Sequence, residues 1–240
     1  MKKLVVPFAA VAALGVGLIF WLSSSIDNIV KEQIEVVGSE LMGVPVTVDF
    51  VDLDLSEGAG TISGLVVGNP AGYKSAHAMS LSALKLNIGL LSLAKQNPIV
   101  IESLVVDSLD TNLEFRETTS NLTEISESIQ KNSSNAEEKT QKSESGSSLM
   151  LAIKELHVTG TTVSIVGVEN SETKSIPTIS MQNVGGETGA SPVIVSGAII
   201  SKLITEILKE AAAQRLKKTV TDTVDELTKG LLDSLNKAIE

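Results

Sequence analysis

The stretch Ile101-Glu102-Ser103-Leu104-Val105-Val106 decides the fold, because its pattern recurs along the chain. An apolar residue is followed by two variable residues, a leucine, one variable residue and a second apolar residue. Further copies begin at Phe50, Ile62, Leu81 and Ile153, and a degenerate copy with glutamine in place of leucine begins at Ile179. Short apolar segments that recur between turn residues are typical of repeated supersecondary units that bury their faces on one another. The pattern therefore favours a scaffold or groove over a compact catalytic domain.

Each copy of the pattern predicts a strand in which the apolar side chains change from one face of the sheet to the other. Along a regular strand, side chains at the first and fourth positions point to opposite faces of the sheet, whereas those at the fourth and sixth positions point to the same face. A bulge or bend is therefore expected between the first and fourth positions. One such inversion is expected near Phe50–Val51. Strands that bend at a common point make a strongly curved sheet. The short connections favour antiparallel pairing, with reversals expected at Glu57–Gly60, Asn69–Gly72, Gln96–Pro98 and Thr159–Gly160.

The apolar positions of the complete copies are the candidate groove residues. They are Phe50, Leu53, Leu55, Ile62, Leu65, Val67, Leu81, Leu84, Leu86, Ile101, Leu104, Val106, Ile153, Leu156 and Val158. The alternation of side chains along a strand defines two faces of the sheet but does not decide which face lines the groove. The chain is 42% hydrophobic but only 2% aromatic, so the buried surfaces are aliphatic and suit acyl chains.

Composition excludes several classes of function. The formal net charge of −10 and the lack of a dense Lys/Arg cluster argue against nucleic acid as a partner. The chain has 0 Cys, and its histidines, His77 and His157, lack the companions that a nucleophile or metal site needs. The acidic run Asp52–Glu57 lacks the glycine and the final glutamate of a calcium loop. No catalytic residue, metal site or cofactor is therefore expected, and the protein is predicted not to be an enzyme.

The N-terminus predicts attachment to a membrane. The uncharged stretch Leu4–Leu22 would span about 28 Å as a helix at ~1.5 Å per residue, which matches the hydrocarbon core of a bilayer. Lys2 and Lys3 precede it and Asp27 follows, so the positive-inside bias places the rest of the chain on the far side of the membrane. A cleaved signal peptide is the alternative, with small residues such as Ser23 at the cleavage position. The body of the protein is exported on either interpretation.

Two helices are predicted around the first strands. Residues with helical spacing follow the membrane stretch, and Gly43 can end that helix. They are Ile26, Val30, Ile34, Val37 and Leu41. This helix either packs in the ordinary way or closes the groove end nearest the membrane. A short helix is expected at Ser120–Gln130, followed by a flexible insertion at Lys131–Ser148, where the polar composition cannot offset the entropy of ordering.

An amphipathic helix is predicted for Ile199–Ile239, after strands at Leu151–Val158, Thr161–Val168 and Pro177–Val184. Three interpretations compete for this helix: closure over the sheet, an interfacial membrane helix, and a coiled-coil partner. The expected organisation is a membrane anchor (residues 1–24), a first helix and sheet part (25–130), the flexible insertion (131–148), a second sheet part (149–190) and a C-terminal helix (191–240).

The order of these features resembles the bacterial AsmA-like family. The resemblance rests on the N-terminal anchor, the amphipathic helix, the Gly-Leu-x-Val-x-Asn-Pro-x-Gly-Tyr run at Gly64–Tyr73, the alternating strand at Leu84–Leu90, the copy at Ile101 and the Ser-Asn-Leu run at residues 120–122. It implies an inner-membrane protein with a periplasmic, taco-shaped β-sheet whose apolar trough holds lipid chains. This chain is short for the family. Roughly ten strands at ~4.8 Å predict a trough of about 45 Å, which is too short to bridge two membranes.

The sequence therefore predicts a non-catalytic α+β protein with an N-terminal transmembrane helix and a curved antiparallel sheet. Its expected location is the inner membrane, crossed once, with the C-terminal body in the periplasm. Its expected role is to bind or pass acyl chains of phospholipids or other lipids in a β-groove, and so to serve lipid homeostasis of the cell envelope. The alternative is an envelope scaffold that binds a protein partner through its C-terminal helix. A homo-oligomer that lengthens the groove is a further expectation.

Overall fold

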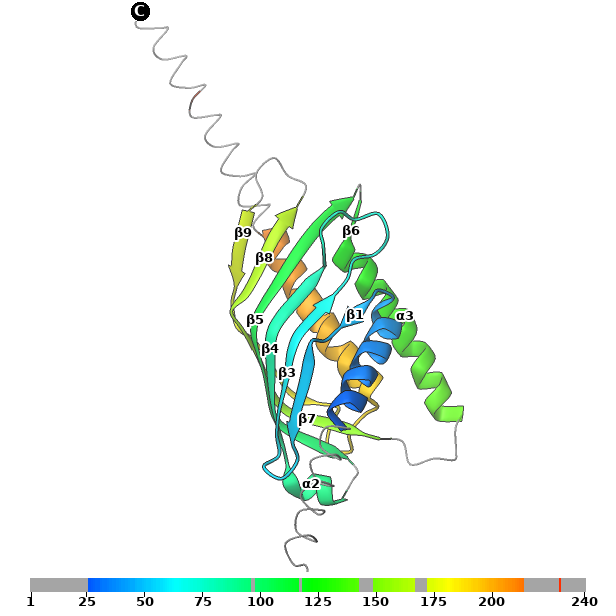
Figure 1. The fold of residues 1–240 in the computed structure, drawn as a ribbon. Helices are drawn as coiled ribbons and strands as arrows, with labels where there is room; N and C mark the ends of the chain where they lie inside the picture. The colour runs from blue at the N-terminus through cyan, green and yellow to red at the C-terminus, as the bar shows by residue number, and fades with distance from the viewer. Residues whose placement is uncertain are drawn as a thin grey trace, which may run out of the picture.

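The computed structural model describes residues 26–95, 98–116, 118–142, 149–166, 172–213 and 229. Within these residues the fold is α+β, with a large, mostly antiparallel, open sheet and four helices (Figure 1). The helices are residues 26–42, α2 (Leu90–Lys95), α3 (Asn121–Lys142) and residues 192–213. The expected anchor at Leu4–Leu22 lies outside the described residues. Among the helices that are described, none combines the length and the apolar character needed to cross a bilayer.

The sheet contains ten strand segments. They are β1 (Val46–Thr47), β2 (Phe50–Asp54), β3 (Ala59–Val67), β4 (Met79–Ile88), β5 (Ile99–Arg116), β6 (Thr119–Ser120), β7 (Leu151–Thr159), β8 (Thr161–Val166), β9 (Glu172–Ile176) and β10 (Ile179–Val184). The main path through the sheet is β1-β3-β4-β5-β7-β10. β1 and β2 follow one another along β3, and β7 and β8 follow one another along β5. β10 pairs with β7 and β9 pairs with β8, so these two segments also lie in one line.

Nine of the segments therefore occupy six positions across the sheet, and β6 pairs only with the end of β5. Five spacings of ~4.8 Å give a sheet about 24 Å wide at right angles to the strands. The width of about 45 Å expected from the sequence is too large, because that estimate assigned each segment a position of its own. The reversal expected at Thr159–Gly160 is also wrong: Gly160 joins β7 to β8 in one direction, and both segments pair with β5. The connection at Glu57–Gly60 does reverse the chain, from β2 to β3.

One central pairing is parallel, although most of the sheet is antiparallel as expected. β5 and β7 run side by side, with Leu104 opposite Leu156 and Val106 opposite Val158. Further along, Leu113 of β5 lies opposite Ile165 of β8. α3 lies in the crossover between these strands, because a parallel pairing needs a long connection. The similar segments that start at Ile101 and Ile153 in the sequence are therefore direct neighbours in the sheet.

A crease crosses the sheet along a line of residues at which the side chains change the face to which they point. In β5, Val106 and Leu109 are both buried, whereas the two residues between them are exposed. The crease passes through residues that interrupt the regular strand geometry, and positive φ angles mark three of them: Gly64, Ser108 and Gly160. Asp49 of the β1–β2 junction and Pro177 of the β9–β10 junction lie on the same line. The inversion predicted from the sequence is confirmed near Phe50, in β3 between Ile62 and Leu65, and in β4 between Leu81 and Leu84. In β5 the crease lies beyond Val106, the last position of its copy.

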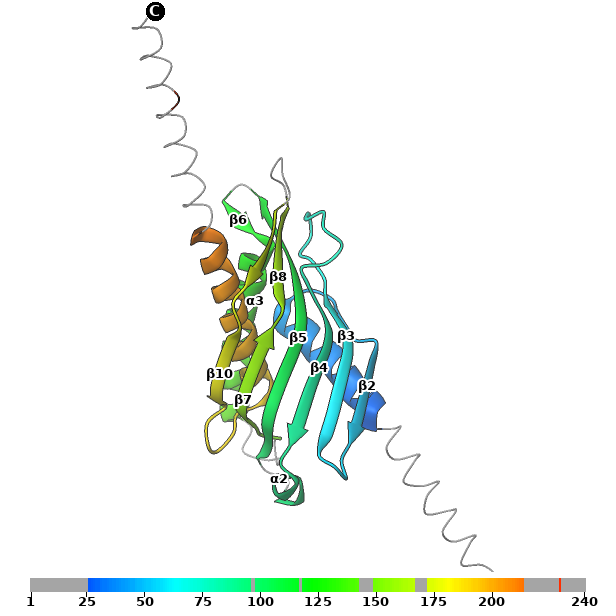
Figure 2. The same cartoon turned by 90° about the vertical axis from the view of Figure 1, so that its left-hand side faces the viewer.

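The helices cover one face of the sheet. In Figure 2 the strands lie in front, and the helix at residues 26–42, α3 and the helix at residues 192–213 lie behind them. The main core lies between these layers and contains Leu122, Ile125 and Ile129 of α3, each at most 1% exposed. Ile204 and Ile207 of the C-terminal helix are equally buried in it. For residues 192–213, the helix therefore closes over the sheet, as the first of the three interpretations proposed.

Two helix boundaries differ from the sequence predictions. The expected flexible insertion begins at Lys131, but α3 continues to Lys142, and residues 143–148 lie outside the described part. Lys, Glu, Gln and Ala propagate a helix well without burial once its first turns are packed. The Asn132 side chain also donates hydrogen bonds to the carbonyl oxygens of Glu40 (2.7 Å) and Leu41 (3.2 Å), which ties α3 to the first helix. The C-terminal helix begins at Pro192, earlier than Ile199, because proline is favoured in a first turn.

Candidate functional site

The candidate groove residues divide into three groups by exposure. Seven are buried between the sheet and the helices: Ile62, Val67, Leu104, Val106, Ile153, Leu156 and Val158. Six are half-buried and pack against the edges of these clusters: Leu53, Leu65, Leu81, Leu84, Leu86 and Ile101. Phe50 and Leu55 are exposed by 55% and 39%. Phe50 belongs to the face opposite Val51, and Leu55 lies in the turn after β2, so neither belongs to the helix-covered surface.

Four of the half-buried residues form one surface, which we call the aliphatic strip: Leu53, Leu84, Leu86 and Ile101. Leu53 and Leu86 are both paired with Gly60, and a Cβ atom at Gly60 would lie 2.6 Å from Leu53 Cδ2 and 2.9 Å from Leu86 Cδ1. The two leucine side chains therefore meet above a residue that has no side chain. The strip lies between the crease and the end of the sheet that carries α2.

The strip separates two packed clusters. On one side, Val30 and Ile34 of the first helix pack near Val48, Val51 and Ile62. On the other side lies the main core beneath α3 and the C-terminal helix. Leu84 and Leu86 touch both clusters and remain half-buried. The helices thus leave a row of aliphatic side chains less covered than the packed surface on each side of it.

A buried polar network fixes the loop between β3 and β4 at the opposite end of the sheet. Asn121 is fully buried, and its amide group donates to Asn69 Oδ1 and to the Asn112 carbonyl oxygen, each at 2.8 Å. Its Oδ1 accepts from the backbone N–H groups of Leu122 (2.9 Å) and Glu114 (3.0 Å). The asparagines of the two motifs that carry the family resemblance, Asn69 and Asn121, therefore bond to each other.

The Glu114 carboxylate holds the next part of the same loop. It is 6% exposed and accepts hydrogen bonds from the backbone N–H groups of Lys74 and Ser75 and from the Ser75 hydroxyl, at 2.9–3.0 Å. Burial on its own raises the pKa of this carboxyl group, but the hydrogen bonds from Ser75 and Lys74 outweigh burial and hold the pKa below its ordinary value. No local pattern in the sequence predicts this role, since a charged residue in a strand is ordinarily exposed.

Tyr73 lies in the middle of the same loop. Its hydroxyl donates to Glu124 at 2.6 Å, and the Arg116 guanidinium lies 5.4 Å from the centre of its ring. Burial, together with the Glu124 carboxylate, raises the pKa of Tyr73 to about 12. The hydrogen bonds of Asn69, Tyr73 and Ser75 tie this loop to β5 and α3, which indicates a structural function for the network.

The uncovered face of the sheet brings together a serine, a histidine and a glutamate that the sequence did not connect. His157 Nδ1 lies 3.0 Å from Ser180 Oγ, and His157 Nε2 lies 3.8 Å from Glu155. The His157 and Glu155 side chains are 42% and 57% exposed. They project from β7, whose backbone N–H groups are engaged by β5 and β10 and so cannot form an oxyanion hole. The arrangement fits a polar surface cluster better than a catalytic triad.

The other polar candidates have local partners. Asp54 accepts hydrogen bonds from the Ser56 hydroxyl (2.6 Å) and from the N–H groups of Ser56 and Glu57, which cap the turn and lower the pKa of Asp54. His77 lies 3.3 Å from Ser80 Oγ. Over the residues that the structure describes, no group of three or more His, Cys, Asp or Glu side chains could hold a metal ion.

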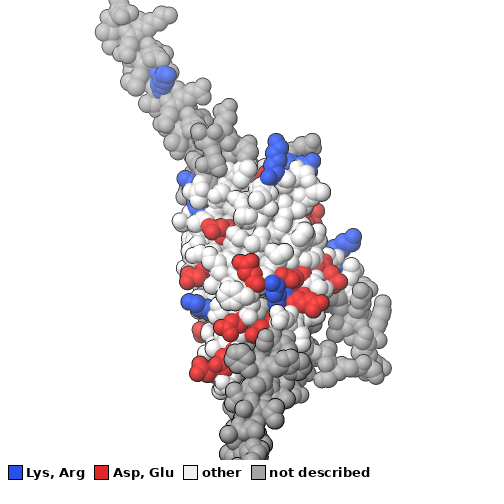
Figure 3. Space-filling model, viewed as in Figure 1, with Lys and Arg blue, Asp and Glu red and all other residues white. Residues whose placement is uncertain are grey.

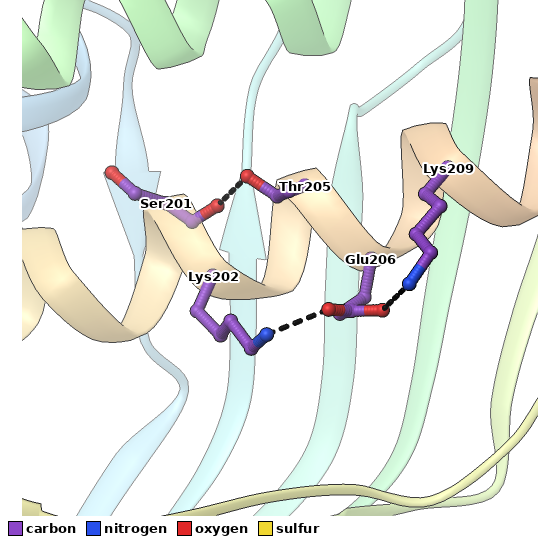
Figure 4. A network of polar contacts seen from close by, with 5 residues as sticks. All are labelled: Ser201, Lys202, Thr205, Glu206 and Lys209. Carbon is purple, nitrogen blue, oxygen red and sulfur yellow. Dashed lines mark hydrogen bonds and ion pairs between the residues drawn. The ribbon is translucent and has the colours of Figure 1, made fainter.

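The outer surface of the C-terminal helix is polar. Glu206 pairs with Lys202 at 2.6 Å and with Lys209 at 3.7 Å, and Thr205 donates to the Ser201 carbonyl oxygen (Figure 4). The hydrogen bond from Lys202, with the charges of both lysines, lowers the pKa of Glu206. Exposed pairs of this kind add little to stability. The apolar face of residues 192–213 is already used by the core of the protein itself.

Comparisons with known proteins identify no relative: no protein-family model matches the chain, and no curated protein matches it. The resemblance to the AsmA-like family therefore stays a prediction from the sequence. The site is defined by its geometry alone, as a half-buried aliphatic strip bounded by two packed clusters.

Proposed function

We propose that this protein is a membrane-anchored, non-catalytic protein of the periplasm that binds or passes lipid acyl chains along the aliphatic strip. The observation that carries the proposal is the half-buried state of Leu53, Leu84, Leu86 and Ile101 on a face that is otherwise packed by helices. Aliphatic side chains that stay partly exposed beside a packed core lower the free energy of the system when they contact another apolar surface.

The proposed architecture is that of the AsmA-like family, with a strongly curved sheet attached to the inner membrane by Leu4–Leu22. Two features support it: the crease that runs across all the strands, and the uncharged stretch that precedes residue 26. With a width of about 24 Å, the sheet would hold lipid near its own membrane and would need a longer partner to reach a second one.

Photocrosslinking at two adjacent residues tests lipid binding. A benzophenone amino acid in place of Leu86 lies in the strip, whereas the same group in place of Lys85 lies on the opposite, exposed face of β4. In membranes that contain the full chain, we expect lipid adducts from position 86 and few from position 85. Equal labelling at both positions, or no adduct from position 86, would rule out the strip as the lipid site.

A charged substitution gives a second test. Leu84→Asp should lower the yield of lipid adducts from position 86 while leaving the fold intact, because Leu84 is only half-buried. Leu104→Asp is unsuitable, since Leu104 is 7% exposed and lies in the main core. A charge at that position would unfold the protein whatever its function.

Because the apolar face of residues 192–213 is used by the core, the alternative of a scaffold that binds a protein partner concerns residues 214–240, which lie outside the described part of the chain. Deleting these residues removes none of the described contacts of the C-terminal helix. A scaffold that binds through this segment would lose its protein partner and keep its fold. A lipid-binding strip would keep its lipid adducts in the same variant.

A further inference from the structure

Exposed aliphatic side chains gather at one end of the molecule. Among the described residues, seven large apolar side chains are exposed: Ile29, Val36, Phe50, Leu55, Leu90, Leu91 and Leu149. Five of them belong to the end of the sheet where β2 turns into β3, where α2 joins β4 to β5, and where β7 begins. They are Ile29, Leu55, Leu90, Leu91 and Leu149. Leu91 is the most exposed, at 81%.

The leucines of α2 are held in place. The backbone N–H of Ile88 donates to the Gly58 carbonyl oxygen at 2.6 Å, and a Cβ atom at Gly58 would lie 3.1 Å from Leu90 Cδ2. Leu90 therefore sits against the β2–β3 turn, which also carries Leu55. Ser92 fixes the other side, because its hydroxyl donates to the Gly89 carbonyl oxygen (2.6 Å) and accepts from the Val100 N–H (2.9 Å). We call Leu55, Leu90 and Leu91 the leucine tip.

The chain enters the described structure at this same end. The backbone N–H of Leu53 donates to the Asp27 carboxylate at 3.1 Å, which places the first turn of the first helix beside the end of β2. In the sequence, only Ser23–Ser25 separate the apolar stretch Leu4–Leu22 from residue 26. The four steps from Leu22 to residue 26 span at most about 14 Å at ~3.6 Å per residue. A membrane that holds Leu4–Leu22 therefore lies within that distance of the end that carries the leucine tip.

The charges of the molecule do not favour electrostatic binding to a membrane. Acidic side chains are spread over the lower half of the face in Figure 3, with few basic ones between them. The net charge of the chain is −10. Membrane-surface proteins usually use basic residues to bind anionic lipids. Contact through this end must therefore come from the burial of apolar side chains.

We infer that the leucine tip inserts into the surface of the bilayer that anchors the chain, so that the aliphatic strip opens next to the lipid headgroups. The inference rests on the proposed membrane attachment and adds a second contact to it. Insertion of the tip would hold α2 and the β2–β3 turn against the leaflet. The strip begins next to this tip, since Leu53 is separated from Leu55 by a single residue.

Single-cysteine labelling tests the inference, because the natural chain has 0 Cys. Leu91→Cys and the control Phe50→Cys each replace an exposed apolar residue, at the tip and away from it. The full chain carrying an environment-sensitive fluorophore at either position is reconstituted into phosphatidylcholine nanodiscs. We expect blue-shifted emission and quenching by spin-labelled lipid several-fold stronger at position 91 than at position 50. Equal quenching at the two positions would overturn the inference.

The response to lipid charge gives a second readout. Replacing part of the phosphatidylcholine with phosphatidylglycerol should leave the quenching at position 91 unchanged or lower it. An increase would show that basic groups drive the contact and would contradict the inference. Emission that is shifted at position 91 without lipid quenching, and that depends on protein concentration, would identify a second copy of the chain as the occupant instead.

The outcome can be separated from that of the proposed function. Lipid adducts from position 86 together with a water-exposed label at position 91 would overturn the tip inference alone. Loss of both signals would overturn the proposed function as well. Leu91→Asp provides the matching variant, because it leaves the core untouched. It should lower the lipid adducts from position 86 several-fold, whereas Phe50→Asp should not.

Discussion

The Glu35 carboxylate accepts a hydrogen bond from the backbone N–H of Val48 at 2.8 Å, across the free edge of the sheet. Three more side chains on the same row of the first helix bond to the same edge. Asp27 accepts from the Leu53 N–H, Lys31 donates to the Asp49 carbonyl oxygen, and Ser39 accepts from the Val46 N–H. Residues four apart lie on one helix face. The helix thus protects an edge that would otherwise be open to pairing with another chain.

Replacing Glu35 with alanine should destabilise the protein by about 1–2 kcal/mol, because the Val48 N–H is left without its partner in a half-buried place. Glu35→Gln keeps an acceptor oxygen and should cost less. Glu32→Ala, at an exposed position of the same helix, is the control. Urea unfolding followed by circular dichroism measures the three differences. A Glu35→Ala variant as stable as Glu32→Ala would show that the edge bond contributes nothing.

Stability should fall in acid through Glu114. The folded-state pKa of Glu114 lies below its unfolded value of about 4.3, so the carboxylate stabilises the fold above that pH, and this contribution is lost as the pH falls through the folded-state pKa. Glu114→Gln should cost about 1–3 kcal/mol at neutral pH. The gap between the two unfolding curves should close in acid. A gap that stays constant from pH 7 to acid would contradict this assignment.

Gly64→Ala should destabilise the crease. Gly64 has a φ angle of +64°, and an added Cβ atom would overlap the Asp49 carboxylate. The left-handed conformation alone costs an alanine about 1–2 kcal/mol, and the overlap adds to it. In an Asp49→Ala background the cost of Gly64→Ala should therefore become smaller. Thermal unfolding of the two single variants and the double variant measures this coupling; additive effects would rule out the contact.

Alanine substitutions should distinguish the core from the strip. Leu156 is 0% exposed, so Leu156→Ala should cost about 2–5 kcal/mol. Leu86→Ala removes the same atoms from a half-buried site and should cost clearly less. Lipid crosslinking from position 84 should show the reverse order among variants that remain folded, with the larger loss in Leu86→Ala. Equal costs in urea unfolding would show that Leu86 is part of the core.

The repeat pattern predicted the main architecture, and the residues explain why. The pattern puts Leu104 and Leu156, and Val106 and Val158, at equivalent positions of two copies, and these residues are partners in the sheet. A repeated pattern places equivalent side chains at equivalent depths, so it predicts which residues share a layer. It does not give strand direction. The sequence predicts a reversal at Thr159–Gly160, but a glycine serves turns and bulges equally well, and Gly160 continues the chain in one direction.

The polar contacts were beyond prediction from the sequence. Glu35, Glu114 and Asn121 have partners that depend on how a helix or loop is placed against the sheet, and no local signal encodes that placement. The same reason explains the division of the candidate groove residues. The pattern marks Leu84 and Leu104 as equivalent, but only the position of the covering helices leaves Leu84 half-buried and Leu104 buried.

The first helix covers the edge of the sheet at β1 and β2, so only the opposite edge can accept further strands. Helix side chains occupy the hydrogen-bonding groups of one border, so any added strand must join at the other border, next to β9 and β10. The parallel step from β5 through α3 to β7 shows how such an addition is made, by a helix that carries the chain back to its starting end. Longer proteins of this architecture can be built by repeating that step outward from β10, while the border covered by the first helix stays the same.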